Sequence, residues 1–260
     1  NLNLIIQDID FSYTARGMPL EFIRAYNADD PREGTFGRSW TFNYNVSLVE
    51  NSDRSIDVYR GDGKVDHFYW NGTRYQGPDG VYDTLTKNTD GTYSLKLKKD
   101  KTTQSFNSQR RLTNIKDRNN NTITFTYDTE GKLTRITDPN SKNIDLSYGA
   151  NKKVSNLTLA DSRSVSFVYD TKNNLIQTTD MKGATSSYTY DSASYITAIT
   201  TPHQGTTKIT YYIQTGYSYV ITSITDGLGN VRRYEPVATP GERLSHQAAK
   251  VTDSRGNSTV

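Results

Sequence analysis

The sequence predicts an all-β protein in which antiparallel hairpins, repeated every 21 residues, pair into one long sheet. Three observations support this fold class. Tyrosines recur with a constant spacing, the residues before them alternate between apolar and polar, and turn-forming residues separate the alternating segments. Helical periodicity is absent throughout the chain.

The 21-residue step is carried by columns of equivalent residues. The aromatic column is Phe106, Tyr127, Tyr148, Tyr169, Tyr190 and Tyr211. An aliphatic column with the same step is Leu112, Leu133, Val154, Leu175 and Ile196. A further column is Ile115, Ile136, Leu157 and Ile199, interrupted by Thr178. A period of this length indicates an array of small supersecondary units, each burying an apolar face against its neighbour.

Each unit is expected to contain two strands joined by turns. In 122–127 the apolar residues alternate with threonine, which predicts a strand with one apolar face. Residues 128–131, Asp-Thr-Glu-Gly, then predict a hairpin turn. The second strand has Leu133 and Ile136 three residues apart, which predicts a β-bulge or a sharp twist. A second turn follows at 138–140, Asp-Pro-Asn.

The aspartate that follows each column tyrosine is interpreted as a turn former. A catalytic role is disfavoured because Gly149 and Tyr212 replace this aspartate in two units while the tyrosine column continues. The tyrosine rings are expected on the inner face of the sheet, stacked as cross-strand ladders, with each hydroxyl meeting a partner or water.

Two domains are predicted, with a boundary near Asp90-Gly91. Residues 1–90 form a pre-repeat β domain without the 21-residue step, and strands separated by turns are expected between Ile56 and Tyr75. Residues 91–260 contain the repeats, of which the last is truncated. The strand pattern continues across the boundary, so the two parts could share one sheet.

Composition excludes several classes of protein. Of the 260 residues 33% are hydrophobic and 19 are tyrosine, and the absence of cysteine excludes disulfides, Fe–S clusters and thiolate zinc sites. The net charge of +3 is spread along the chain, so no nucleic-acid partner is predicted. No membrane span is expected, because no segment approaches the roughly 20 apolar residues that one needs. The basic run at Lys96, Lys98, Lys99 and Lys101 is interpreted as the solvated face of a strand.

No catalytic, cofactor-binding or metal-binding residue is predicted. A cluster of Asp57, Asp62, Asp66 and His67 is conceivable, but strand alternation points Asp66 and His67 in opposite directions. His203 and His246 lie in turn-like or terminal sequence. Trp40 and Trp70 are interpreted as packing anchors, although a tryptophan could also stack on a sugar.

Two sets of motifs resemble the YD-repeat or Rhs family. YDTEGKLTRITD from Tyr127 and VYDTKNNLIQTTD from Val168 are similar to its repeat. FIRAYN, GTFGRSW and DGKVDHF, within 22–68, resemble the domain that precedes the repeats in bacterial Rhs proteins and wall-associated YD proteins. The pre-repeat motif residues are Arg24, Tyr26, Gly34, Phe36, Gly37 and Trp40.

The resemblance implies a curved, spiralling β-shell. In Rhs proteins, the Tc toxin C subunit and teneurins, such repeats form a hollow cocoon, which in the bacterial toxins encloses a C-terminal effector. The chain is therefore expected to be a non-catalytic wall segment of a longer exported bacterial protein, secreted or on the cell surface. Its implied partners are the rest of its own shell and an enclosed effector, and it lacks the family's aspartate-rich autoproteolytic motif. The alternative is a cell-surface or cell-wall carbohydrate-binding module.

Size limits what the segment could enclose alone. A cargo of about 130 residues has a radius of gyration near 14 Å, so a wall around it needs about 30 strands at 4.8 Å spacing. Five repeat units supply about ten strands. We therefore expect an opening section of a larger shell, or an open sheet with edges prone to pairing.

Overall fold

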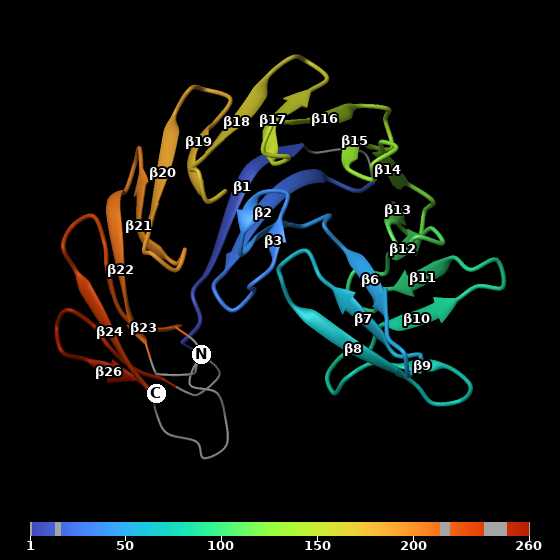
Figure 1. The fold of residues 1–260 in the computed structure, drawn as a ribbon, viewed down its shortest axis with the longest axis horizontal. Helices are drawn as coiled ribbons and strands as arrows, with labels where there is room; N and C mark the ends of the chain where they lie inside the picture. The colour runs from blue at the N-terminus through green and yellow to red at the C-terminus, as the bar shows by residue number, and fades with distance from the viewer. Residues whose placement is uncertain (1, 14–16, 214–218, 237–248, 260) are drawn as a thin grey trace.

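The computed structural model of the chain describes residues 2–13, 17–213, 219–236 and 249–259. All regular elements in these ranges are β-strands, so the predicted all-β class is confirmed. Figure 1 shows the strands as an arc that opens downward, with the first strands of the chain lying inside it. The described ranges contain no helix with the length and apolarity to cross a membrane.

The arc is a single antiparallel sheet of 17 strands whose order in space follows the order in the chain. We call it the outer sheet. Its strands are β10 (Thr84–Lys87), β11 (Tyr93–Lys96), β12 (Thr103–Phe106), β13 (Leu112–Lys116), β14 (Thr122–Tyr127), β15 (Leu133–Thr137), β16 (Asn143–Tyr148), β17 (Val154–Leu159), β18 (Ser164–Tyr169), β19 (Leu175–Thr179), β20 (Thr185–Tyr190), β21 (Ile196–Thr201), β22 (Gly205–Ile213), β23 (Tyr219–Thr225), β24 (Val231–Pro236), β25 (Ala249–Thr252) and β26 (Ser258–Thr259).

Aspartates build the hairpin turns, as the sequence predicted. In the turn after β15 the Oδ1 of Asp138 accepts hydrogen bonds from the backbone N–H of Asn140 and of Lys142, both at 2.8 Å. The backbone N–H of Ser141 donates to the carbonyl of Asp138 at 3.1 Å. The same side-chain pattern recurs at Asp170. In each turn the aspartate carboxylate thereby satisfies two backbone N–H groups.

The predicted β-bulge is present in every complete unit. Between β14 and β15 the register runs Thr126↔Arg135 and then Tyr127↔Leu133, which leaves Thr134 without an opposite residue. The same shift occurs between β16 and β17, β18 and β19, β20 and β21, and β22 and β23. The extra residue re-aims the following side chain, which is why Leu133 and Ile136 both reach the core although they lie three residues apart.

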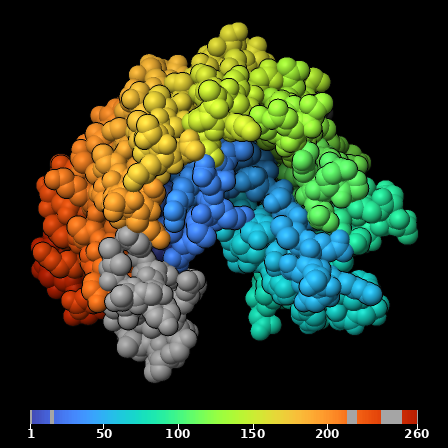
Figure 2. All heavy atoms as spheres, in the orientation of Figure 1, coloured from blue at the N-terminus to red at the C-terminus, as the bar shows by residue number. Residues whose placement is uncertain are grey.

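The N-terminal part forms an inner layer on the concave side of the outer sheet. The inner sheet has the order β1 (Ile5–Tyr13), β2 (Leu20–Asn27) and β5 (Trp40–Phe42), and a small hairpin joins β3 (Glu33–Gly34) to β4 (Gly37–Arg38). Figure 2 shows this layer in blue under the crown of the arc. The buried apolar side chains of both layers form one continuous cluster.

A four-stranded side sheet lies beside the first strands of the arc. It consists of β6 (Ser47–Glu50), β7 (Ile56–Tyr59), β8 (Val65–Trp70) and β9 (Tyr75–Gln76), which agrees with the strands predicted between Ile56 and Tyr75. An isolated bridge pairs Ser47 with Arg111, directly before β13. The side sheet is thereby attached to the start of the repeats.

Several details differ from the sequence-based expectation. The outer sheet begins at Thr84, and the residues Asp90 and Gly91 lie in the turn between its first two strands. Trp40 is 2% exposed and is a packing anchor, whereas Trp70 is 38% exposed at the end of β8, so its prediction as an anchor was wrong. The lysine run is exposed as expected, but beyond Lys96 it lies in the connection to β12 rather than on a strand.

Candidate functional site: the contact between the inner layer and the tyrosine columns

The column tyrosines link each repeat unit to the preceding one. In all five cases the hydroxyl donates a hydrogen bond to the backbone carbonyl of the aliphatic-column residue that lies 15 positions earlier. The pairs are Tyr127 with Leu112, Tyr148 with Leu133 and Tyr169 with Val154, each at 2.8 Å, and Tyr190 with Leu175 and Tyr211 with Ile196, each at 2.7 Å. The aromatic column and the aliphatic column are therefore joined to each other.

These hydrogen bonds do not build the stacked ladder of tyrosine rings that was expected from the sequence. All five rings pack against the core on the same side of the sheet. Successive column tyrosines lie on alternate strands, however, which places them about 9–10 Å apart, beyond the 4.5–7 Å range of ring contacts. Each column tyrosine therefore contacts the preceding unit through a hydrogen bond from its hydroxyl to a backbone carbonyl. Phe106, the first member of the column, is 1% exposed and contributes packing alone.

Burial keeps the column hydroxyls protonated, so that they remain donors. Desolvation raises the pKa of Tyr127 to about 12. It raises the pKa of Tyr148, Tyr169, Tyr190 and Tyr211 as well. Each acceptor is a backbone carbonyl at the bulged end of its strand, where the sheet ladder is interrupted.

The pre-repeat motif GTFGRSW reaches the concave face through residues 33–40, which we call the Phe36 loop. The Phe36 ring meets Phe167 of β18 edge to face, with centroids 5.0 Å apart. The backbone N–H of Val154 donates to the Thr35 carbonyl at 2.9 Å, and Lys153 Nζ donates to the Gly34 carbonyl at 2.9 Å. The loop thus pairs with β17 and packs on β18.

Both glycines of this motif are required by close approach. Gly37 has a φ of +96°, and a Cβ placed on it would lie 2.5 Å from the carbonyl oxygen of Asn173. A Cβ on Gly34 would lie 2.8 Å from the carbonyl oxygen of Trp40. A side chain at Gly37 would push the loop away from the repeats, and one at Gly34 would disturb the fold of the loop itself.

Trp40 and Tyr26 bind the repeat units at β20 and β21. Trp40 Nε1 donates to Tyr190 Oη at 3.0 Å, and its ring lies edge to face with Tyr188 at 5.2 Å. Tyr26 Oη accepts a hydrogen bond from the backbone N–H of Ile196 at 3.3 Å. One residue of each repeat column, Tyr190 and Ile196, is therefore held by the pre-repeat motif.

Arg24 carries a buried charge in the middle of the contact. Its Nε and Nη2 donate to the two carboxylate oxygens of Asp10 at 2.7 and 2.9 Å, and Asp8 lies 3.5 Å away. The guanidinium carbon also lies 5.1 Å from the centre of the Trp40 ring and 5.2 Å from that of Phe167. Desolvation opposes the charge on Arg24, but the charge of Asp10 prevails and raises the Arg24 pKa.

The carboxylates around Arg24 are held by the same network. Desolvation raises the pKa of Asp10, and Arg24 opposes that rise. Tyr188 donates from its hydroxyl to Asp8 Oδ2 at 2.7 Å. The group forms a hydrogen-bonded link between β1, β2 and β20, and its chemistry is that of an internal ion pair.

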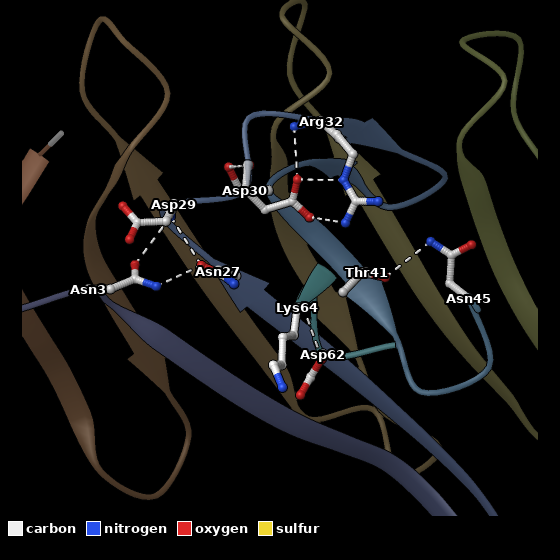
Figure 3. Close-up of polar contacts among 10 residues, drawn as sticks. Asn3, Asn27, Asp29, Asp30, Arg32, Thr41, Asn45, Asp62 and Lys64 are labelled. Atoms are coloured by element: carbon white, nitrogen blue, oxygen red, sulfur yellow. Dashed lines mark hydrogen bonds and ion pairs between the residues drawn. The ribbon is translucent and has the colours of Figure 1, made fainter. Parts of the chain in front are cut away.

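Polar contacts fix the base of the Phe36 loop, as Figure 3 shows. Asp30 accepts hydrogen bonds from the backbone and the guanidinium of Arg32, the latter at 2.7 and 2.6 Å. Asn3 donates from Nδ2 to Asn27 Oδ1 at 2.7 Å, and the N–H of Asp29 donates to the same oxygen at 3.1 Å. The loop therefore leaves the inner sheet from a rigid base.

The acidic residues near His67 do not converge on one point. Asp66 is buried and bonds Arg60 at 2.8 Å, whereas the exposed His67 places Nδ1 2.7 Å from Asp57. Over the ranges that the structure describes, no three His, Asp or Glu side chains are grouped as a metal site would need. His246 lies outside the described residues.

Sequence reasoning missed the partners of Arg24. The available signal was the charge pattern, because Asp8 and Asp10 alternate with apolar residues on β1 and Arg24 has apolar neighbours on both sides in β2. Opposite charges on neighbouring apolar strands favour a buried pair. Tyr188 gave no such signal, since its alternation only predicted an inward-facing ring.

Two family models match this chain. Residues 101–226 match the family described as Teneurin YD-shell, and residues 3–68 match a domain of unknown function, DUF6531. The resemblance of the repeats to YD-repeat proteins is confirmed for the first of these stretches. The second stretch contains the inner layer and continues through β6 and β7 of the side sheet into β8.

Curated relatives match a similar share of the chain. The chain is similar to the tRNA nuclease WapA of Bacillus subtilis and to the tRNA3(Ser)-specific nuclease WapA of Bacillus spizizenii. Each is 33% identical over 132 residues, which is 48% of this chain and 5% of the relative. The match thus spans about one-twentieth of the length of these relatives.

Solved structures of Tc toxins also align with the chain. The TcdB2-TccC3-TEV structure covers 96% of this chain and 19% of its own, at 11% identity and a TM-score of 0.33. The Photorhabdus luminescens Tc holotoxin pore covers 98% of this chain and 14% of its own, at 12% identity and a TM-score of 0.40.

Proposed function

We propose that this chain is a non-catalytic end section of a YD-repeat shell. The outer sheet serves as the wall, and the inner layer closes the concave side of its first turns. In the longer bacterial protein the completed shell encloses a C-terminal toxin or effector, and that protein is secreted or displayed at the cell surface. The partners of this section are the later repeats and the enclosed effector.

The observation that carries the proposal is the contact between the Phe36 loop and the repeat columns. Trp40 bonds Tyr190, Tyr26 bonds Ile196, and Phe36 packs on Phe167, all from the concave side of the sheet. A layer fixed there by buried aromatic rings blocks the end of a channel formed by the wall. The Arg24 guanidinium over Phe167 and the hydrogen bond from Tyr188 to Asp8 add to the same attachment.

Open edges support the role of a section within a larger wall. Among the described strands β10 and β26 each pair on one side only within the outer sheet. Seventeen strands are fewer than the about 30 needed around a folded cargo. Further hairpins added beside β26 would continue the wall and satisfy the unpaired backbone groups of that edge.

Protease protection tests the proposal in a longer chain that carries this section, the later repeats and the C-terminal domain. We expect the C-terminal domain to resist a broad-specificity protease in the wild type and to be cleaved faster in Trp40→Ala, because the inner layer loosens. Trp70→Ala is the matched control, since Trp70 lies outside the contact. Cleavage of the wild-type domain as fast as of the isolated domain would refute encapsulation.

A further inference from the structure

A second polar and aromatic site lies away from the inner layer, where the side sheet meets the first strands of the arc. It is a pocket of about 410 Å³. Its lining is formed by Glu50, Arg54, Trp70, Tyr75, Lys87, Asn88 and Thr89. The volume lies within the range of about 300–1,000 Å³ that is usual for small-ligand sites. None of these residues takes part in the contact with the tyrosine columns.

One side of the pocket is an exposed indole ring held by a buried tyrosine. Trp70 is 38% exposed, while Tyr75 is only 8% exposed. Their ring centroids are 5.1 Å apart at 62°, so the edge-to-face contact fixes the indole and leaves part of it open to solvent. An immobilised, exposed tryptophan offers an apolar platform to the C–H face of a sugar ring.

The lining of the pocket also offers cationic donors. The Arg54 guanidinium forms no hydrogen bond or ion pair with any residue that the structure describes. Lys87 Nζ lies 2.7 Å from Glu50 Oε1, and an ammonium has three donors, so it keeps N–H capacity for a ligand. Tyr93 donates to the other oxygen of Glu50 at 2.9 Å. These contacts hold Lys87 and Glu50 in place.

The charges favour a small anionic ligand with hydroxyl groups. Arg54 and Lys87 outnumber Glu50 by one positive charge. The hydrogen bond from Lys87 lowers the pKa of Glu50, so this carboxylate stays ionised at neutral pH and accepts hydroxyl donors. It would also repel a run of phosphates, which disfavours a nucleic-acid chain.

From this geometry we propose that the pocket binds a sugar bearing an anionic group, with the sugar ring on Trp70 and the carboxylate or phosphate at Arg54. Lys87 assists at the anion, and Glu50 and Asn88 accept hydroxyl groups. The inference is independent of the shell function, since it needs neither an effector nor the later repeats.

Titration of the 260-residue chain tests the proposal directly. The probes are a hyaluronan hexasaccharide, in which glucuronate alternates with N-acetylglucosamine, glucose 1-phosphate, and the neutral hexamer of N-acetylglucosamine. Trp40 is buried, so a ligand-dependent change in tryptophan fluorescence reports on Trp70. We expect saturable binding of at least one anionic probe, at least about tenfold tighter than of the neutral hexamer. The probe that binds identifies the anion as carboxylate or phosphate.

Matched variants, measured by isothermal titration calorimetry, assign the site. We expect Trp70→Ala to weaken anionic-probe binding at least about tenfold, and Arg54→Ala to do the same while leaving the neutral hexamer within about twofold. The controls are Tyr69→Ala and Arg74→Ala, an exposed ring and an exposed cation of the same sheet outside the pocket.

Three results would overturn the proposal. They are no saturable binding of any anionic probe, unchanged binding in Trp70→Ala or Arg54→Ala, and tighter binding of a single-stranded oligonucleotide than of either sugar. Circular dichroism melting of each variant checks that it folds, which matters most for Trp70→Ala because the indole packs on the buried Tyr75, whereas Arg54 is exposed.

Discussion

Trp40 and Tyr190, 150 residues apart in the sequence, share a hydrogen bond of 3.0 Å from the indole Nε1 to the phenol oxygen. The same hydroxyl donates to the carbonyl of Leu175 at 2.7 Å. One phenol therefore couples the inner layer to two successive repeat units. Removing it breaks two interactions at once, whereas the other column tyrosines, such as Tyr148, each hold a single carbonyl.

Replacing column tyrosines by phenylalanine should show this difference. Tyr148→Phe leaves the Leu133 carbonyl without its donor, and we expect a loss of about 1–2 kcal/mol in the free energy of unfolding. Tyr190→Phe also leaves Trp40 Nε1 unsatisfied, so a loss of about 2–4 kcal/mol is expected. Urea denaturation measures both. Tyr212→Phe, at a side chain 56% exposed, is the control and should change stability by less than about 0.5 kcal/mol. Equal losses for Tyr148→Phe and Tyr190→Phe would contradict the coupling.

Gly37 and Gly72 offer a matched pair for the fit of the Phe36 loop. Both have a positive φ, at +96° and +94°, but only at Gly37 would a Cβ meet backbone, 2.5 Å from the Asn173 oxygen. We expect Gly72→Ala to cost about 1 kcal/mol through backbone strain alone. Gly37→Ala should cost about 2–4 kcal/mol because overpacking is added. Thermal or urea unfolding distinguishes them, and similar costs would mean that the loop has room to shift.

The buried ion pair of Arg24 and Asp10 should stabilise the fold only when both residues are present. Arg24→Met leaves Asp10 as an uncompensated buried carboxylate, and we expect a loss of about 3–5 kcal/mol. The double variant Arg24→Met/Asp10→Leu removes both charges and should recover most of that loss. Urea denaturation of the two single variants and the double variant completes the cycle. A double variant as unstable as the sum of the two single variants would show that the two residues act independently.

Turn aspartates set the expected dependence of stability on pH. Hydrogen bonds from the side chains of Asn121, Asn230 and Asn257 lower the pKa of Asp117, Asp226 and Asp253, respectively. Because the folded-state pKa lies below the unfolded value of about 3.9, the stabilisation is complete above that value. It is lost as the pH falls through the folded-state pKa.

The urea midpoint should therefore be similar at pH 7 and pH 5 and should fall below pH 4. Asp117→Asn should reduce the size of that acid-induced fall, because it removes one titrating turn. A midpoint that already drops between pH 7 and pH 5 would contradict the assignment of the acid response to these turns.

Local structure could be predicted because its causes are local. Asp138 forms its turn with residues two and four positions away, and Leu133 and Ile136 reveal the bulge by their spacing alone. The docking of Phe36 on Phe167 could not be predicted, because no periodicity relates the pre-repeat motif to a particular unit. Shape decides that contact, through the close approach of Gly37 to the carbonyl of Asn173.

The candidate site could be predicted from the sequence only in part, for the same reason. The tyrosine column indicated which residues face inward, but the carbonyl acceptors are backbone atoms and have no signature of their own. The prediction of Trp70 as a packing anchor was wrong because apolar neighbours in the sequence do not show that the end of a strand projects beyond the core.

The N-terminal part holds the arc at distant places, since Ser47 pairs with Arg111 before β13 and Trp40 bonds Tyr190 at the end of β20. Farther along the arc, the backbone N–H of Ile221 on β23 donates to the Leu2 carbonyl at 3.1 Å. The N-terminal part thereby fixes the distance between these parts of the outer sheet. Inserting one more 21-residue module between two of these contacts would lengthen the outer sheet but not the N-terminal part, and one contact would be lost. Modules added after β23 meet no such restriction, so a container built this way can change its capacity by growth at one end only.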